Sequence, residues 1–440
     1  MTQNRAQFAT KLGVIAATVG SAVGLGNIWR FPYEAGTGGG GAFLICYIIF
    51  VLLLGVPTIC AEFVLGRASH LGMPGAYRHA SGSRRWDAIG YLAILAALMI
   101  MSFYAVVAGW TLEYIVDSVG GLFQATPNSA RHAQFAAFTG SWRAVGWTVI
   151  FLLVNAAVML GGVQKGIERV SNILMPLLFA ILIAFCINSL LLPERDAGLE
   201  FLFKPDFSKL TAGHVLSAMG QAFFSLSLGM GCMVTYASYF KDSTPLVKTS
   251  LQIALLDTLV AILAGIIIFP AVFSFGMSPA EGPTLVFEVL PDIFHSMAGG
   301  RIWSALFFLL LAVASLTSII SISEIVVTFL CDDFRLSRLK ATLSVTAIAL
   351  IFGSLCSLSF GPLRELDLFN LFDYISSNIL MPLGGLAACL FVGWRMKPVV
   401  LSAQLHMGGR VAPWLYTSLL FCLRYIAPAG ILLVFIAGLL

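Results

Sequence analysis

Residues 20–32, GSAVGLGNIWRFP, decide the fold because they lie inside an apolar run long enough to cross a membrane. Glycines at positions 20, 24 and 26 each weaken a helix here by about 1 kcal/mol relative to alanine. Backbone groups freed in hydrocarbon must find partners, so such a break is tolerated only where it lines a cavity or packs on protein. The stretch therefore predicts a membrane helix broken near its middle.

A second broken span is expected at residues 223–231, FFSLSLGMG, which again place glycines inside an apolar run. Two interrupted helices in corresponding halves of a chain indicate a transport site near the bilayer midplane. Together the two stretches predict a transporter.

The amino-acid composition indicates the structural class of the protein. The 440 residues are 59% hydrophobic and 10% charged, whereas soluble domains carry about 25% charged residues. We therefore expect an all-α polytopic membrane protein. With no metalloprotease, P-loop or nucleophile-elbow motif we expect no enzyme, and with a net charge of +4 no nucleic-acid partner.

Apolar runs separated by polar or Gly/Pro-rich loops predict eleven transmembrane helices, near residues 11–35, 42–66, 88–118, 144–161, 167–192, 213–240, 246–276, 302–331, 341–359, 368–394 and 412–439. Lys and Arg are more frequent in the loops that share a side with the N-terminus. This bias predicts a cytoplasmic N-terminus and, with an odd number of spans, an extracytoplasmic C-terminus. The membrane would be a bacterial inner membrane.

The two broken spans divide the chain into a 5+5 inverted repeat, in which helices 1 and 6 are broken at the midplane. An odd repeat length inverts the halves in the membrane, which is the architecture of alternating access. The expected parts are an N-terminal tail at 1–10, a first repeat at 11–192, an extracellular linker at 193–212, a second repeat at 213–394, and the last helix with its loop at 395–440.

Ionisable residues within spans indicate function because they are costly in hydrocarbon. Asp257 lies mid-span with no Lys or Arg within a helical turn. Either a cation or proton neutralises it, or it is a protonated residue hydrogen-bonded to a neighbouring helix. Glu62 is expected either to cap backbone amides of the first broken span or to pair with Arg67. Hydroxyls at Thr317 and Ser318 offer oxygens to Na⁺, or serve ordinary helix packing.

The two broken stretches resemble a known family. Residues 20–32 closely resemble the first-span motif of the neurotransmitter:sodium symporters, and residues 224–229 with 235–239 (FSLSLG and TYASY) resemble that family's sixth span. The resemblance extends over essentially the whole chain. It implies a sodium-coupled symporter that imports an amino acid by alternating access.

The resemblance also implies two sodium sites. The first would use the Ala22 carbonyl, Asn27, Ser225 and Asp257, which aligns where many relatives have Asn. The second would use carbonyls of Gly20, Val23 and Ala314 with the hydroxyls of Thr317 and Ser318. Oxygen ligands without several carboxylates suit a monovalent ion. Because the Asp257 carboxylate can balance the sodium charge, we expect that chloride is not required.

The substrate site implied by the resemblance comprises Ala22, Gly24, Gly26, Tyr104, Phe224, Ser225, Ser227, Met230, Ser318 and Ile322. Gly24 stands where amine-transporting relatives carry Asp, so the substrate must bring its own carboxylate. A zwitterionic α-amino acid fits, with its charges facing sodium and the ends of the half-helices. The apolar end, with Ile100, predicts a hydrophobic or aromatic side chain.

Two gates follow from the same resemblance. Arg30 with Asp373 would close the outside, although Phe372 competes for the aligned position. Arg5 with Asp332 would latch the N-terminal tail on the cytoplasmic side. Two other functions remain open: an amino-acid sensor of the same fold that does not transport, and an ion channel, since glycine-rich breaks also build selectivity filters.

Overall fold

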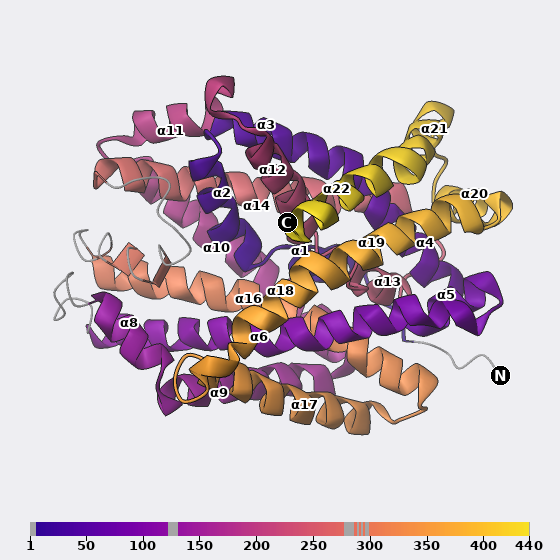
Figure 1. Ribbon diagram of the computed structural model, residues 1–440, viewed down its shortest axis with the longest axis horizontal. Helices are drawn as coiled ribbons and strands as arrows, with labels where there is room; N and C mark the ends of the chain where they lie inside the picture. Colours follow the sequence, from indigo (N-terminus) through magenta and orange to yellow (C-terminus); the bar gives the residue numbers. More distant parts are fainter. Residues whose placement is uncertain are drawn as a thin grey trace.

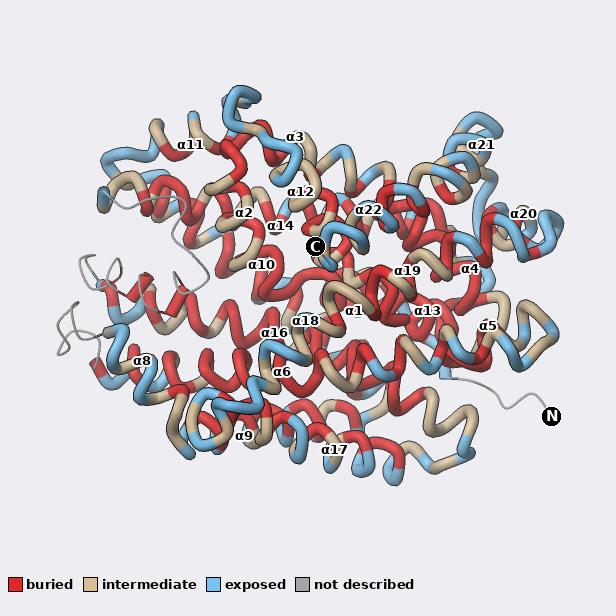
Figure 2. Tube along the Cα trace, in the orientation of Figure 1, coloured by how far each residue is buried: buried red, intermediate tan, exposed pale blue. Residues whose placement is uncertain are grey.

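The computed structural model describes residues 6–121, 131–276, 286–287, 290–291, 294 and 299–439. Within these residues the chain is helical, and the one strand-like contact is an isolated bridge between Gly40 and Pro205. The long helices run across the view in Figure 1, with α8 and α11 at one end of the bundle and α5 and α20 at the other. Buried residues fill the middle of the bundle, and exposed ones gather at its two ends (Figure 2).

The first half of the chain forms the following helices and helical turns: α1 (Lys11–Ala22), η1 (Gly26–Arg30), α2 (Phe31–Thr37), α3 (Gly41–Phe50), η2 (Val51–Gly55), α4 (Val56–Ser69), α5 (Met73–Ser81), η3 (Arg84–Trp86), α6 (Asp87–Gly120), α8 (Arg131–Thr139), α9 (Trp142–Leu160), η5 (Val163–Glu168) and α10 (Arg169–Ser189).

The second half forms α11 (Arg195–Phe203), η6 (Phe207–Lys209), α12 (Ala212–Ser225), α13 (Cys232–Ala237), α14 (Leu246–Ser274), α16 (Gly300–Asp333), α17 (Arg338–Leu358), η8 (Arg364–Leu366), α18 (Leu368–Tyr374), η9 (Ile375–Leu380), α19 (Met381–Leu390), η10 (Phe391–Arg395), α20 (Pro398–His406), α21 (Pro413–Phe421), η11 (Cys422–Ile426) and α22 (Ala427–Leu439).

Length and hydropathy make this a membrane protein. Nine helices of the described chain are long and apolar enough to cross a bilayer, and a tenth span results if α1 and the helix 26–37, bent by 53° at their junction, count as one. The prediction of an all-α polytopic membrane protein is confirmed. The count of eleven and the inverted repeat stay predictions.

Both expected breaks are present. The first separates α1 from η1, where Gly24 N–H donates to Asn27 Oδ1 (3.1 Å) and Leu25 N–H to the Tyr104 hydroxyl (3.3 Å). The second separates α12 from α13 and has positive φ at Ser227, Gly229 and Gly231. A Cβ on Gly229 would lie 2.0 Å from the Met381 carbonyl oxygen, so this break rests directly on α19. Helices α6 and α16, 34 residues each, pack along each other beside the breaks.

Candidate ion and substrate site

A buried carboxylate joins the two broken helices. Asp257 on α14 is fully buried. Its Oδ1 accepts a hydrogen bond from Asn27 Nδ2 (2.7 Å), and its Oδ2 accepts from the Ser225 hydroxyl (2.7 Å) and the Tyr47 hydroxyl (3.0 Å). All three donors are neutral, so they solvate the carboxylate without cancelling its charge. The site is therefore suited to a cation, because buried charge needs compensation.

Beside the first break lies a second group of oxygens. The Ser318 hydroxyl donates to the carbonyls of Val23 (3.3 Å) and Ala314 (3.2 Å), and the Thr317 hydroxyl donates to Ala314 (3.0 Å). A Cβ on Gly20 would lie 3.1 Å from Thr317 Cβ, so α1 and α16 meet closely here. All five residues expected at the second sodium site are thus brought together, and each offers a neutral oxygen.

Between the breaks lies a narrow cavity of about 30 Å³. It is lined by Ala22, Gly24, Leu25, Gly26, Ile100, Tyr104, Phe224, Ser225, Ser227, Met230, Ser318 and Ile322. The set contains all ten residues expected for the substrate, together with Leu25 and Ile100. No charged side chain is among these lining residues. The lining combines four hydroxyl-bearing residues with apolar side chains.

The glycine at position 24 controls the room in this cavity. A Cβ there would lie 2.8 Å from the Ser318 hydroxyl and 2.9 Å from the Tyr104 hydroxyl. Both atoms are ends of side chains, so the neighbours would have to shift. Any side chain larger than hydrogen would therefore compete directly with a ligand for the space beside these two hydroxyls.

Outside the cavity lies a vestibule of about 320 Å³ that Arg30, Phe224 and Asp373 help to line. Phe224 lines both spaces, as do Leu25, Gly26 and Tyr104. The Arg30 guanidinium lies over the Phe224 ring, 4.9 Å from its centre, and pairs with Glu34 (3.5 Å). Asp373 accepts a hydrogen bond from Ser377 (2.9 Å) instead. The structure places Arg30 and Asp373 in one vestibule but does not join them.

At the end of the bundle where the described N-terminal segment lies, the packing is closed. Phe8 is 1% exposed and meets the rings of Tyr236 and Tyr239 edge-on. Both Nη atoms of Arg338 bind the Glu324 carboxylate (2.9 and 2.7 Å), which also accepts from the Tyr239 hydroxyl (2.6 Å).

Of the predicted cytoplasmic gate pair, Arg5 and Asp332, the structure describes only Asp332. Asp332 accepts a hydrogen bond from Gly72 N–H (2.7 Å). Arg5, its expected partner, lies outside the described residues.

Glu62 requires a correction. Its Oε1 accepts a hydrogen bond from Gly229 N–H (2.7 Å), so it braces the second break and not the first. Arg67 instead donates to the carbonyl oxygen of Thr244 (2.6 Å) and to Gln404. Both roles expected from the sequence were therefore wrong. The physical reason is that α4 packs against α13, which places the carboxylate beneath the amides freed in the second break.

Two polar residues of the site were missed. Tyr47 on α3 donates to Asp257, and Gln221 Nε2 on α12 donates to the Gly26 carbonyl (2.9 Å). Gln221 lies one helical turn before Ser225, and this spacing was the only signal that could have revealed it. Tyr47 sits in an apolar run and gave no signal of its own.

Comparison with known proteins gives a consistent result. The model of the sodium:neurotransmitter symporter family matches residues 5–129 and 137–440. The chain is 37% identical to YhdH of Bacillus subtilis, described as an uncharacterized sodium-dependent transporter, over 99% of this chain and 98% of that protein. It is 25% identical to the bovine sodium-dependent dopamine transporter, over 99% and 69%. The crystal structure of MhsT in complex with L-phenylalanine has a similar fold, with a TM-score of 0.90 over 99% of this chain and all of that one. The two sequences are 41% identical.

Proposed function

Because this chain belongs to the sodium:neurotransmitter symporter family, whose members are sodium-dependent transporters rather than enzymes, we propose that it imports a hydrophobic or aromatic L-α-amino acid with sodium. The observation that carries the proposal is the cavity between the two breaks. Its lining has no charged side chain and combines the hydroxyls of Tyr104, Ser225, Ser227 and Ser318 with apolar side chains such as Ile100, Met230 and Ile322. MhsT, the relative of similar fold, was crystallised with L-phenylalanine, which supports this class of substrate.

The substrate's charges are compensated without side-chain charges. The carboxylate would lie at the first break, close to the Tyr104 hydroxyl and a bound sodium ion. The ammonium group would face carbonyls of the second break. Helix ends that point into a site in opposite directions favour this arrangement of charges. Ile100, Met230 and Ile322 surround the side chain, and the flexible Met side chain adapts to different shapes.

Two sodium ions are part of the proposal. The first would be bound by Asn27, Ser225, Asp257 and the Ala22 carbonyl, and the second by the oxygens of Gly20, Val23, Ala314, Thr317 and Ser318. Three neutral donors hold Asp257 in place. A fixed negative charge therefore lies beside the first ion, and we expect transport without chloride.

The order of steps in the proposed transport cycle follows from the difference between the vestibule side and the cytoplasmic side of the protein. The vestibule is open and the cytoplasmic side is closed, so substrate enters from outside past Phe224. Approach of Arg30 and Asp373 would then close the vestibule. We place the protein in a bacterial inner membrane with eleven spans in a 5+5 inverted repeat, the N-terminus cytoplasmic and the C-terminus outside.

The test is a thermal-shift screen of the twenty amino acids in sodium and in potassium, followed by counterflow in proteoliposomes. A ligand at 100 times its Kd stabilises the folded state by about 2.7 kcal/mol. We expect this effect for large apolar amino acids in sodium alone, and saturable counterflow of the same compounds. Equal stabilisation in potassium would contradict sodium coupling. Binding without counterflow would favour a sensor, and conductance without saturable flux a channel.

A further inference from the structure

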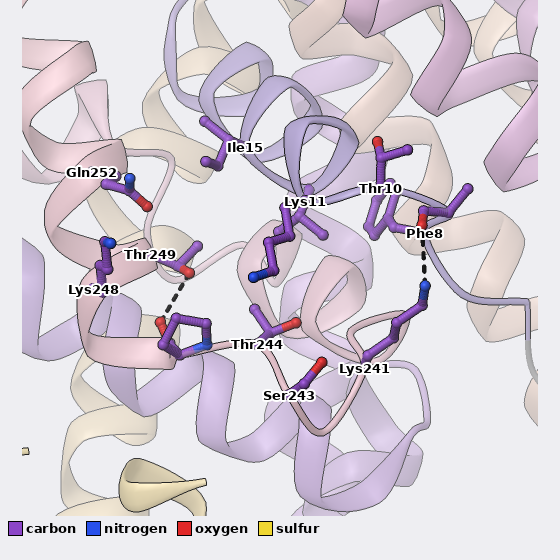
Figure 3. A pocket seen from close by; sticks show the side chains of 13 residues that line it. Phe8, Thr10, Lys11, Ile15, Lys241, Ser243, Thr244, Lys248, Thr249 and Gln252 are labelled. Atoms are coloured by element: carbon purple, nitrogen blue, oxygen red, sulfur yellow. Dashed lines mark hydrogen bonds between the residues drawn. The ribbon is translucent and has the colours of Figure 1, made fainter. Parts of the chain in front are cut away.

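A second, larger cavity lies on the cytoplasmic side of the protein. It has a volume of about 390 Å³ and lies between the N-terminal segment, the start of α14 and the loop that leads into α14 (Figure 3). Its lining residues are Phe8, Ala9, Thr10, Lys11, Val14, Ile15, Lys241, Ser243, Thr244, Pro245, Lys248, Thr249 and Gln252. None of them lines the substrate cavity or the vestibule.

The charge of this cavity is uncompensated. Three lysines from three segments, Lys11, Lys241 and Lys248, surround it, and no acidic side chain is among its lining residues (Figure 3). Lys241 Nζ donates to the Ala9 carbonyl (3.0 Å). Within the described chain, Lys11 and Lys248 make no hydrogen bond or ion pair, and neither do the hydroxyls of Ser243 and Thr244. The cavity therefore presents cationic and neutral donors to an anion.

Two acidic residues, Glu168 and Asp242, belong to segments close to the cavity without lining it. Glu168 accepts hydrogen bonds from the backbone N–H groups of Ala9 (2.8 Å) and Thr10 (3.0 Å). Asp242 lies in the exposed loop next to Lys241. Arg67 of α4 donates to the Thr244 carbonyl and so holds the loop from its other side. Neither acid lines the cavity. The positive charge of the three lysines thus remains available to a ligand.

Beyond the cavity, the exposed surface of α14 is apolar. Lys248, Gln252, Leu255 and Leu259 follow a helical spacing that places them on one face of α14. Leu255 is 62% exposed and Leu259 is 43% exposed, as is usual for side chains that face lipid. Leu12, on the neighbouring α1, is 65% exposed. The surface changes from cationic to apolar along α14, and this pattern matches the head and tail of an amphiphile.

We propose that this cavity binds the headgroup of an anionic phospholipid, with the phosphodiester between Lys11, Lys241 and Lys248 and an acyl chain along Leu255 and Leu259. The hydroxyls of Ser243 and Thr244 supply further donors to the phosphate oxygens. Because Lys11 belongs to α1 and Lys248 to α14, one bound lipid connects the two helices. It thereby stabilises the closed packing of the N-terminal segment.

The experiment uses the purified, delipidated full chain and measures retained lipid by native mass spectrometry. The probes are phosphatidylglycerol and phosphatidylcholine. The test variant is Lys11→Gln with Lys248→Gln. Its matched control is Lys340→Gln with Lys397→Gln, two exposed cytoplasmic-side lysines outside the cavity. Melting temperatures show whether both variants fold.

We expect wild type to retain phosphatidylglycerol over phosphatidylcholine, and the cavity variant to lose about tenfold in this retention, since each lysine near a lipid surface adds to anion affinity. The control variant should retain the lipid as wild type does. Equal losses in both variants, or no preference over phosphatidylcholine, would overturn the site. Displacement of the lipid by millimolar inorganic phosphate or glycerophosphoglycerol would overturn the lipid as the source of the anion. None of these readouts depends on amino-acid transport.

Discussion

The first helix break, at residues 23–25, contains no residue with positive φ, whereas the second, at residues 226–231, contains three. At the first break the carbonyl of Val23 faces the Ser318 hydroxyl, and Asn27 connects the backbone to the carboxylate of Asp257. At the second break the Gly229 N–H group donates to Glu62. One break therefore offers oxygens to an ion, while the other is stabilised by a carboxylate of the protein itself.

This difference suggests different roles for the two breaks. The first would bind the coupled ion, and the second would keep the shape of the cavity wall. In the proposed sodium sites a cation would complete the oxygens of the first break and its neighbours, so the energy of this region would depend on the sodium concentration. The second break has its own acceptor in the carboxyl group of Glu62 and rests on α19 through Gly229 and Gly384. The second break contacts the end of α1, just before the first break, through the Ser227 hydroxyl, which donates to the Ser21 carbonyl (2.9 Å). In the proposed mechanism, sodium bound at the first break would therefore act on the wall of the proposed substrate cavity.

The largest effect is expected from Asp257→Leu. It removes the charge at the first break and leaves the buried donors of Asn27, Ser225 and Tyr47 without their acceptor. Hydrogen bonds to charged groups contribute about 1.5–3 kcal/mol each, so sodium-dependent binding should weaken by at least about 100-fold. Isothermal titration of the amino acid at several sodium concentrations measures this, with the melting temperature as a check on folding.

Asp257→Asn is the matched control for the charge. It keeps an oxygen acceptor but removes the negative charge, so binding in sodium should become dependent on added chloride. Wild type should bind equally well in chloride and in gluconate. Unchanged sodium-dependent binding in both variants would show that Asp257 is not part of the first ion site.

Gly24→Asp should come next. A carboxylate at this position would lie beside the Ser318 and Tyr104 hydroxyls, where the substrate's own carboxylate is expected. We expect affinity for zwitterionic amino acids to fall by about 10- to 100-fold through like-charge repulsion and lost room. Gly24→Ala separates the two causes because it adds the Cβ without the charge. Equal losses in the two variants would leave only the steric explanation.

Much of this arrangement was predictable because it depends on local sequence. Glycines inside apolar runs located both breaks, and the motif around them located Asn27, Ser225 and ten of the residues that line the cavity. Their role in substrate binding stays a prediction. The role of Glu62 was not predictable, because it depends on which break α4 packs against. Tyr47 was missed since a tyrosine in an apolar run has no distinctive spacing. The separation of Arg30 from Asp373 reflects the conformation of the vestibule, which local sequence does not determine.

A smaller change is expected from Thr317→Val combined with Ser318→Ala. Each substitution removes one neutral oxygen from the second sodium site, and a neutral hydrogen-bonding group contributes about 1 kcal/mol. The sodium concentration for half-maximal stabilisation should therefore rise by about tenfold. Thr346→Val is the control, because its hydroxyl bonds only to the Thr342 carbonyl of its own helix. An unchanged sodium titration in the double variant would remove these hydroxyls from the site.

The smallest effect is expected from Glu62→Gln, and it tests the contrast between the breaks most directly. A glutamine oxygen can still accept from Gly229 N–H, so the free energy of unfolding should fall by less than about 1 kcal/mol. The melting temperature should therefore fall only slightly. Glu62→Leu removes the acceptor and should cost about 1–3 kcal/mol, because it leaves a buried N–H unsatisfied. In both variants the sodium titration of the folded protein should match wild type, since the second break does not bind the ion. A shifted sodium titration in Glu62→Gln would show that the charge of this carboxylate reaches the ion sites, and the two breaks would then act as one electrostatic unit.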